Sequence, residues 1–145
     1  MPHTTYSIEI NRPVKEVFHY LDDEENVTKW LSGLEKIIPI TEGGNRVGAR
    51  ARHVYNENGR TFEMEEETLA YEPNRRVKIR AVGDAFELTA EYILTPLGDR
   101  TRLDFESELK FRNFLLKLIG PLFAGSSKKR IEQDFLRLKA LVEGA

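Results

Sequence analysis

Residues 112–143 read RNFLLKLIGPLFAGSSKKRIEQDFLRLKALVE, and this stretch decides the fold. Its apolar residues recur every three to four positions, a spacing typical of one face of an amphipathic helix. An unbroken helix of this length would extend for about 48 Å, which is far longer than an ordinary strand. Pro121 has no amide hydrogen and its ring crowds the carbonyl of Lys117, so we expect a bend at Gly120-Pro121. The pattern predicts a bent C-terminal helix across one face of a sheet. Its apolar stripe consists of Leu115, Ile119, Leu122, Ile131, Phe135, Leu138 and Val142.

The segment before residue 47 contains the smaller elements. Alternation of apolar and polar residues over 6–10 predicts a strand, and Pro13 then begins a helix with an apolar side. The acidic run at 22–25 interrupts that helix, and a short second helix ends near Trp30. We interpret this acidic run as a solvated helix end. A second strand over 34–41 lacks clean alternation, so its two faces remain unassigned.

Four turn signals divide residues 47–111 into a meander of strands: Asn58-Gly59, Pro73-Asn74, Gly83-Asp84 and Gly98-Asp99. If each is a two-residue hairpin loop, the strand register follows by counting outward, and paired residues share a face. Nearly all the apolar strand residues then fall on one face of the sheet, and the charged residues on the other. The predicted inner-face pairs are Tyr55–Phe62, His53–Met64, Ala51–Glu66, Ala49–Thr68, Thr68–Ile79, Ala70–Val77, Ala81–Phe86, Ile79–Leu88, Val77–Ala90, Leu94–Leu103, Tyr92–Phe105, Ala90–Ser107 and Leu88–Leu109.

The inner face has small residues where a packed core would have leucine or isoleucine. Either the C-terminal helix comes very close to the sheet there, or a hollow remains. An empty void of ~300 Å³ would cost ~7 kcal/mol, comparable with the whole stability of a domain. A hollow of ligand size should therefore be filled by a ligand, by water or by long side chains. The small residues in question are Ala51, Ala70, Ala81, Ala90 and Ser107.

Glu66 is the exceptional polar residue of this face, because Ala51 and Ala81 flank it. Two interpretations stay open for its side chain. In the first, a bulge turns Glu66 outward, or Glu66 lies at the wet mouth of a pocket. In the second, Glu66 orients a ligand or transfers a proton, because burial disfavours its charged form. We expect His53 to lie at the rim of the hollow. We expect Tyr92 to be a core aromatic residue whose hydroxyl has a hydrogen-bond partner. Both residues are further candidates for acid–base chemistry.

Composition excludes several functions. The chain of 145 residues fits one domain, residues 1–145. It has no cysteine, only three scattered histidines and no glycine-rich nucleotide-binding loop, so we expect neither a metal nor a cofactor.

Charge and hydropathy bear on partners and location. With a net charge of −2 and one basic cluster, Lys128-Lys129-Arg130, we expect no nucleic-acid partner and at most transient contact with membranes. The first residues do not resemble a signal peptide and no apolar run could span a membrane, so we expect a cytoplasmic protein.

Short motifs distributed over the whole chain point to one superfamily. They are Pro13-Val14-Lys15-Glu16-Val17-Phe18 with Leu21-Asp22, Trp30, Val47-Gly48-Ala49-Arg50, Tyr71-Glu72-Pro73, Thr101-Arg102-Leu103 and Leu138-Lys139-Ala140-Leu141-Val142-Glu143. With the order of elements, they resemble the START/Bet v 1-like (SRPBCC) superfamily, in particular its polyketide cyclase/dehydrase and lipid-transport branch. The resemblance implies an α+β helix-grip fold, in which a seven-stranded antiparallel curved sheet wraps around a long C-terminal helix and two short helices separate the first two strands. It also implies a deep, mostly apolar cavity between sheet and helix. It assigns no catalytic residues, because the superfamily shares no catalytic set.

We therefore expect a protein that binds or transports a hydrophobic small molecule, such as a lipid, quinone or polyketide-like compound, between the C-terminal helix and the sheet. The alternative is a cyclase or dehydratase that uses Glu66 as acid or base, assisted by His53 or Tyr92. A module that binds a protein partner in the same grip is a third hypothesis. The expected ligand-binding residues are Trp30, Ala51, His53, Tyr55, Met64, Glu66, Ala81, Phe86, Ala90, Tyr92, Phe105, Ser107, Leu115 and Ile119.

Overall fold

Seven strands form one antiparallel sheet in the computed structural model, which describes residues 3–57, 59–112 and 124–145. The strand order is β1-β7-β6-β5-β4-β3-β2, so strands β2 to β7 form a meander and β1 returns beside β7. The strands are β1 (His3–Ile10), β2 (Leu34–Pro39), β3 (Arg50–Glu57), β4 (Arg60–Glu72), β5 (Arg76–Val82), β6 (Phe86–Leu97) and β7 (Arg100–Phe111).

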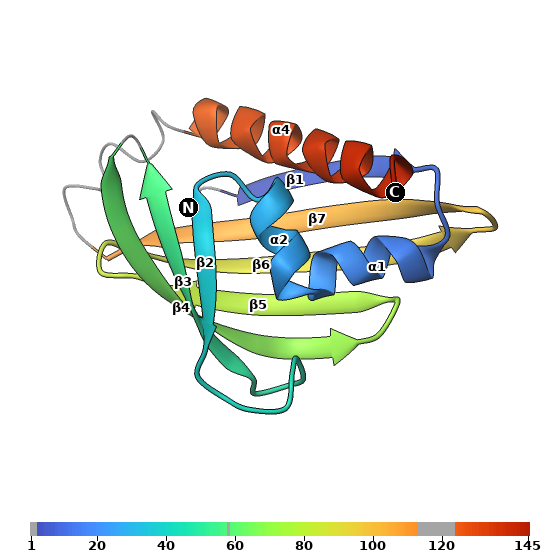
Figure 1. Cartoon of the computed structure of the whole chain (residues 1–145). Coiled ribbons are helices and arrows are strands. Elements are labelled where there is room, and N and C mark those ends of the chain that lie inside the picture. Colours follow the sequence, from blue (N-terminus) through green and yellow to red (C-terminus); the bar gives the residue numbers. More distant parts are fainter. Residues whose placement is uncertain (1–2, 58, 113–123) are drawn as a thin grey trace.

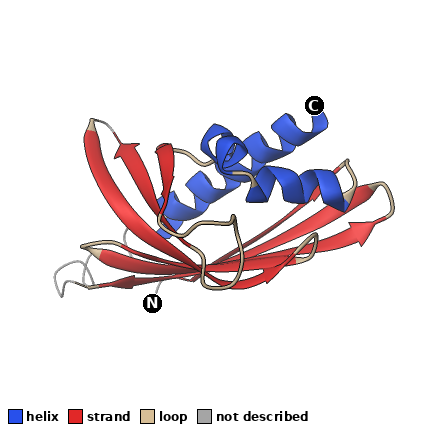
Figure 2. Cartoon of the chain, turned by 60° about the horizontal axis from the view of Figure 1, so that its bottom comes forward, coloured by secondary structure: helices blue, strands red, loops and turns tan. Residues whose placement is uncertain are grey.

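Three helices in the described part of the chain cover one face of this curved sheet (Figures 1 and 2). They are α1 (Val14–Asp22), α2 (Glu24–Trp30) and α4 (Ala124–Glu143). Two short helices thus lie between β1 and β2, and a long helix ends the chain. This arrangement confirms the predicted fold class.

Asp23 is the junction of the two short helices. Its backbone N–H donates to the carbonyl of His19 at the end of α1, and its carboxylate accepts the N–H of Glu25 at 3.0 Å in the first turn of α2. A carboxylate at this position satisfies an amide that the helix itself cannot pair. The acidic run therefore ends one helix and begins the next, as predicted. Pro13 lies just before α1 and not in its first turn.

The predicted apolar stripe of the C-terminal helix is confirmed for its described part. Phe135, Leu138 and Val142 of α4 are buried in the core. The Phe135 ring stacks on Tyr6 at 5.7 Å and on Trp30 at 5.9 Å, which fixes α4 against β1 and α2. The expected bend at Gly120-Pro121, and with it Leu115, Ile119 and Leu122, lies outside the described residues.

Two of the four hairpins have the predicted register. The β3–β4 hairpin pairs Ala51 with Glu66 and His53 with Met64, and the β6–β7 hairpin pairs Tyr92 with Phe105. In both, the two-residue loop was the right assumption. Opposite residues therefore lie on the face that the counting assigned to them.

The β4–β5 hairpin corrects one prediction. Glu72 pairs with Arg76, so the turn has three residues, and Asn74 adopts a positive φ of 64°. A bulge between Thr68 and Ala70 absorbs the extra residue. The predicted pair Ala70–Val77 is consequently wrong, because Ala70 pairs with Lys78 on the outer face.

The β5–β6 hairpin is shifted by two residues. Ala81 pairs with Leu88, and Ile79 with Ala90, so the predicted partners Ala81–Phe86, Ile79–Leu88 and Val77–Ala90 are wrong. The turn lies at Asp84-Ala85, since Gly83 N–H donates to the carbonyl of Phe86 at 2.9 Å. A shift of two leaves every side chain on its predicted face, because side chains alternate with a period of two.

The faces of β2, which the sequence left open, follow from its pairing with β3. Ile37 pairs with His53 and Pro39 with Ala51, so these two β2 residues share the inner face.

Within the described residues, no helix is long and apolar enough to cross a membrane, and no group of three metal-ligating side chains gathers.

Candidate functional site

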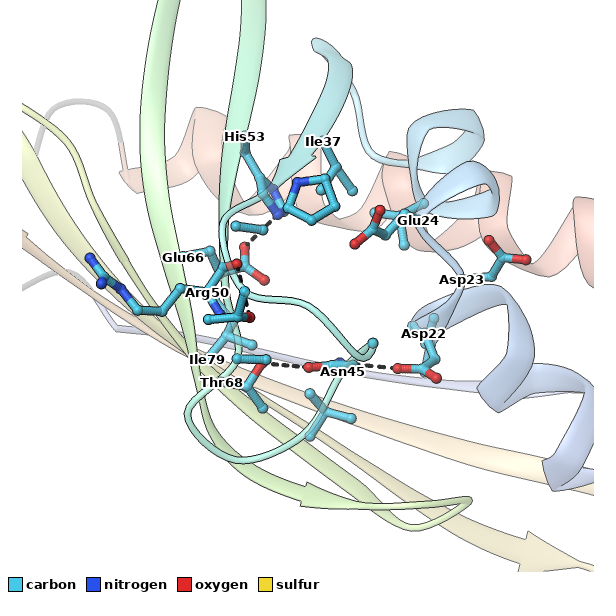
Figure 3. Close-up of a pocket in the computed structure, with 18 of the residues that line it drawn as sticks. Asp22, Asp23, Glu24, Ile37, Asn45, Arg50, His53, Glu66, Thr68 and Ile79 are labelled. Atoms are coloured by element: carbon cyan, nitrogen blue, oxygen red, sulfur yellow. Dashed lines mark hydrogen bonds and ion pairs between the residues drawn. The ribbon is translucent and has the colours of Figure 1, made fainter.

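A pocket of about 990 Å³ opens between the helices and the inner face of the sheet. One wall is the segment from the end of α1 through α2, and a second wall is β2 with the loop that follows it (Figure 3). The floor is formed by inner residues of β3, β4, β5 and β6, with Ala49 just before β3. The residues that line it on the sheet side are Ala49, Ala51, His53, Glu66, Thr68, Val77, Ile79 and Tyr92.

The floor is hollow because its side chains are short. Short side chains occupy neighbouring inner positions: Ala51 of β3, Thr68 of β4, and Ala49 just before β3, whose carbonyl accepts the Thr68 N–H at 2.9 Å. Longer side chains would fill this space. Trp30 and Ile37 close the apolar sides from α2 and β2. The space is of ligand size. Of the small residues that the sequence placed on this face, Ala51 lines it, whereas Ala81, Ala90 and Ser107 do not and Ala70 lies on the outer face.

A chain of hydrogen bonds holds the β2–β3 loop across one side of the pocket (Figure 3). The Thr68 hydroxyl donates to the side-chain oxygen of Asn45 at 2.6 Å, and the Asn45 amide donates to Asp22 at 3.0 Å. The second oxygen of Asp22 accepts the Tyr71 hydroxyl at 2.9 Å. These bonds tie the end of α1 to the loop and to β4.

His53 and Glu66 form the polar centre of the floor. They lie on adjacent strands, two positions apart in register, which brings His53 Nε2 to 3.4 Å from Glu66 Oε2. His53 is 6% exposed, and its Nδ1 has no hydrogen-bond partner among the described residues. The bulge that could have turned Glu66 outward lies further along β4, so Glu66 faces the pocket.

Burial shifts both pKa values toward the neutral forms. It lowers the pKa of His53 to about 4 and raises the pKa of Glu66 to about 7. Between these values the pair holds a neutral imidazole beside a neutral carboxylic acid. Tyr92 lines the same pocket, and burial together with the charge of Glu66 raises the pKa of its hydroxyl. At mildly acidic pH the floor can therefore donate and accept hydrogen bonds without a permanent charge, and above about pH 7 Glu66 becomes negative.

The structure corrects the expected position of the pocket. No described residue of α4 lines it, because Phe135 packs among Tyr6, Trp30 and Phe105 and fills the space between α4 and the sheet. Of the predicted ligand-binding residues, those that line the pocket are Trp30, Ala51, His53, Glu66 and Tyr92. Those that do not line it are Tyr55, Met64, Ala81, Phe86, Ala90, Phe105 and Ser107. Leu115 and Ile119 are outside the described residues.

Sequence reasoning missed the rim. The acidic run at 22–25, interpreted as solvated, borders the pocket together with the loop at 40–45. In Figure 3 the carboxylates of Asp22 and Glu24 turn toward the pocket, whereas that of Asp23 points away. Burial, followed by the charges of Asp23 and Asp22, raises the pKa of Glu24. Because the acidic run lies at a helix junction, its place at the pocket rim could have been inferred from the sequence. The sequence of the loop at 40–45 contains no pattern that predicts its place at the rim.

Comparison with known proteins agrees with this architecture. The family model described as polyketide cyclase / dehydrase and lipid transport matches residues 1–143. No curated protein matches the sequence.

Solved structures share the fold at low sequence identity. TTHA0849 from Thermus thermophilus is 19% identical with a TM-score of 0.79, and the match covers 97% of each chain. Ara h 8.0201 is 13% identical with a TM-score of 0.74 over 99% of both chains. The di-domain ARO/CYC BexL from the BE-7585A biosynthetic pathway is 15% identical with a TM-score of 0.74, over 99% of this chain and 47% of BexL. By its whole-length family match, the chain belongs to the polyketide cyclase/dehydrase and lipid transport family and has the helix-grip fold.

Proposed function

We propose that the protein binds a hydrophobic small molecule in the pocket between the α1–α2 segment, the β2–β3 loop and the sheet. The observation that carries this proposal is the volume of about 990 Å³ over a floor of short side chains. This volume is at the upper end of pockets that hold drug-sized ligands, roughly 300–1,000 Å³. The family description, which includes lipid transport, supports the same class of function.

The His53–Glu66 pair gives such a ligand its orientation. Both groups are neutral over a range of mildly acidic pH, so they can hydrogen-bond a hydroxyl or carbonyl at modest desolvation cost. Apolar contacts with Trp30 and Ile37 would supply most of the affinity.

A cyclase or dehydratase is the second candidate function, and the grouping of acid–base side chains on the floor favours it. Glu66 and Tyr92 line the same pocket, and His53 Nε2 lies 3.4 Å from Glu66 Oε2. Burial raises the pKa of Glu66 to about 7, a value suited to proton transfer at neutral pH. With a substrate in hand, Glu66→Gln should lower turnover by about 100-fold or more while binding persists. Unchanged turnover would remove this candidate.

Binding can be tested with a matched pair of variants. Ala51→Leu extends a side chain into the pocket, whereas Ala70→Leu makes the same change on the outer face of the sheet. Titration with the uncharged dye N-phenyl-1-naphthylamine should show binding that Ala51→Leu weakens and Ala70→Leu leaves intact. Native mass spectrometry of gently purified protein provides a second reading. No dye binding by the wild type, or equal effects of both variants, would contradict the proposal.

A further inference from the structure

The charged side chains that face the pocket have one sign. Glu66 lies on its floor, and Asp22 and Glu24 turn toward it from the helix side (Figure 3). Arg50 is the one lysine or arginine among the described lining residues, and it forms an ion pair with Glu65, away from the pocket. His53 is buried and neutral at pH 7, so it adds no positive charge.

This distribution decides which head group the pocket accepts. A ligand carboxylate or phosphate would approach Glu66 and the rim without a cation to pair with, and like charges at close range repel strongly where water is scarce. A ligand cation would instead meet carboxylates on the floor and at the mouth. The Glu24 carboxylate forms no hydrogen bond or ion pair with any described residue, so it is available to a ligand.

We propose that the occupant is an apolar molecule bearing a positively charged nitrogen, and that the pocket rejects anionic lipids such as fatty acids. This inference rests on the proposed function, because it concerns the ligand of the same pocket. The apolar part would lie over Ala49, Ala51 and Ile79, with the nitrogen near Glu66. Ionisation of Glu66 would accompany binding, since a nearby cation stabilises the charged carboxylate.

Three probes with the same twelve-carbon chain test the proposal: dodecyltrimethylammonium, dodecanol and dodecanoate. At pH 7.5 the two ionic probes are used below their micellar concentrations, and dodecanol below its solubility limit, to displace N-phenyl-1-naphthylamine from the wild-type protein. We expect dodecyltrimethylammonium to bind at least about tenfold more tightly than dodecanoate, and also more tightly than dodecanol. Equal affinities, or preference for the alcohol or the acid, would overturn the charge inference while the proposed binding function stands. Failure of the dye and all three probes to bind would remove the binding function itself.

Two variants separate the pocket charge from the net charge of the protein. Glu66→Gln should remove most of the preference for the cation and strengthen dodecanoate binding. Glu67→Gln removes the same charge from the next residue of β4, which faces the outer side opposite Arg80, and should leave the preference unchanged. Equal effects of the two variants would mean that overall charge, and not the pocket, selects the ligand.

Discussion

Glu66→Gln should make the empty protein more stable at pH 8, although it removes a polar contact. Burial raises the pKa of Glu66 from 4.5 to about 7 in the folded protein. As the pH rises from 4.5 to 7, the unfolded chain releases this proton before the folded chain does, so the free energy of unfolding declines. Each tenfold change in the ionisation constant corresponds to about 1.4 kcal/mol, which sets an upper limit of about 3 kcal/mol. Because the side chain is 23% exposed and solvent weakens the effect, we expect Glu66→Gln to raise the free energy of unfolding at pH 8 by about 1–2 kcal/mol.

Urea unfolding followed by the fluorescence of Trp30, the only tryptophan, measures this effect at pH 5, 6, 7 and 8. The wild type should lose stability over this range relative to Glu66→Gln, and the two should differ least at pH 5. Glu67→Gln, on the outer face of the same strand, should follow the wild type. The reasoning is refuted if the difference between wild type and Glu66→Gln is independent of pH, or if the wild type is the more stable protein at pH 8.

Three further perturbations test the core, the α2–β2 turn and the polar floor. Leu138→Ala should lower the free energy of unfolding by about 2–5 kcal/mol, because Leu138 is 0% exposed. Leu136 is 54% exposed, so Leu136→Ala should change the free energy of unfolding by less than about 0.5 kcal/mol. Equal losses of stability in urea would contradict this account of α4. Gly33→Ala should lower the free energy of unfolding by about 1–2 kcal/mol, since Gly33 has a φ of +81° and an added Cβ would lie 3.1 Å from Arg130 Nη2. An unchanged melting temperature would contradict this expectation. The His53 ring should keep its neutral-form NMR shifts down to about pH 5, because burial lowers its pKa to about 4, and a midpoint near 6.5 would contradict the buried site.

The sequence was sufficient to assign side chains to the two faces of the sheet. Side chains alternate with a period of two, so an error of two residues in the strand register leaves each side chain on its assigned face. The β5–β6 hairpin is displaced by two residues, yet Ala81 and Ala90 remain on the inner face. In the β4–β5 hairpin a three-residue turn added one residue, and a bulge restored the register at Thr68. Ala70 moved to the outer face, and Tyr71, which pairs with Val77, took the inner position. Loop length depends on backbone dihedral angles such as the positive φ of Asn74, which turn residues permit but do not dictate.

The site was harder to predict than the fold because its walls come from long-range packing. Glu66 was recognisable, since a carboxylate between alanines is unusual on an inner face. His53 was expected at the rim, but it is 6% exposed and lies in the floor beside Glu66. The position of the pocket was not, because it depends on where Phe135 docks among Tyr6 and Trp30. The loop at 40–45 has no apolar period, and it is held by Asn45 through contacts with distant residues. Such contacts leave no local pattern in the sequence.

The most direct test of the pocket is its location by NMR. Titration of ¹⁵N-labelled protein with dodecanol should shift the amide signals of Ala49, Ala51, Glu66 and Thr68, which lie on the pocket floor. The amides of β1, and of α4 around Leu138, should shift far less, because that region is packed with aromatic side chains. Shifts confined to β1, β7 and α4, with no change on the floor residues, would contradict the account.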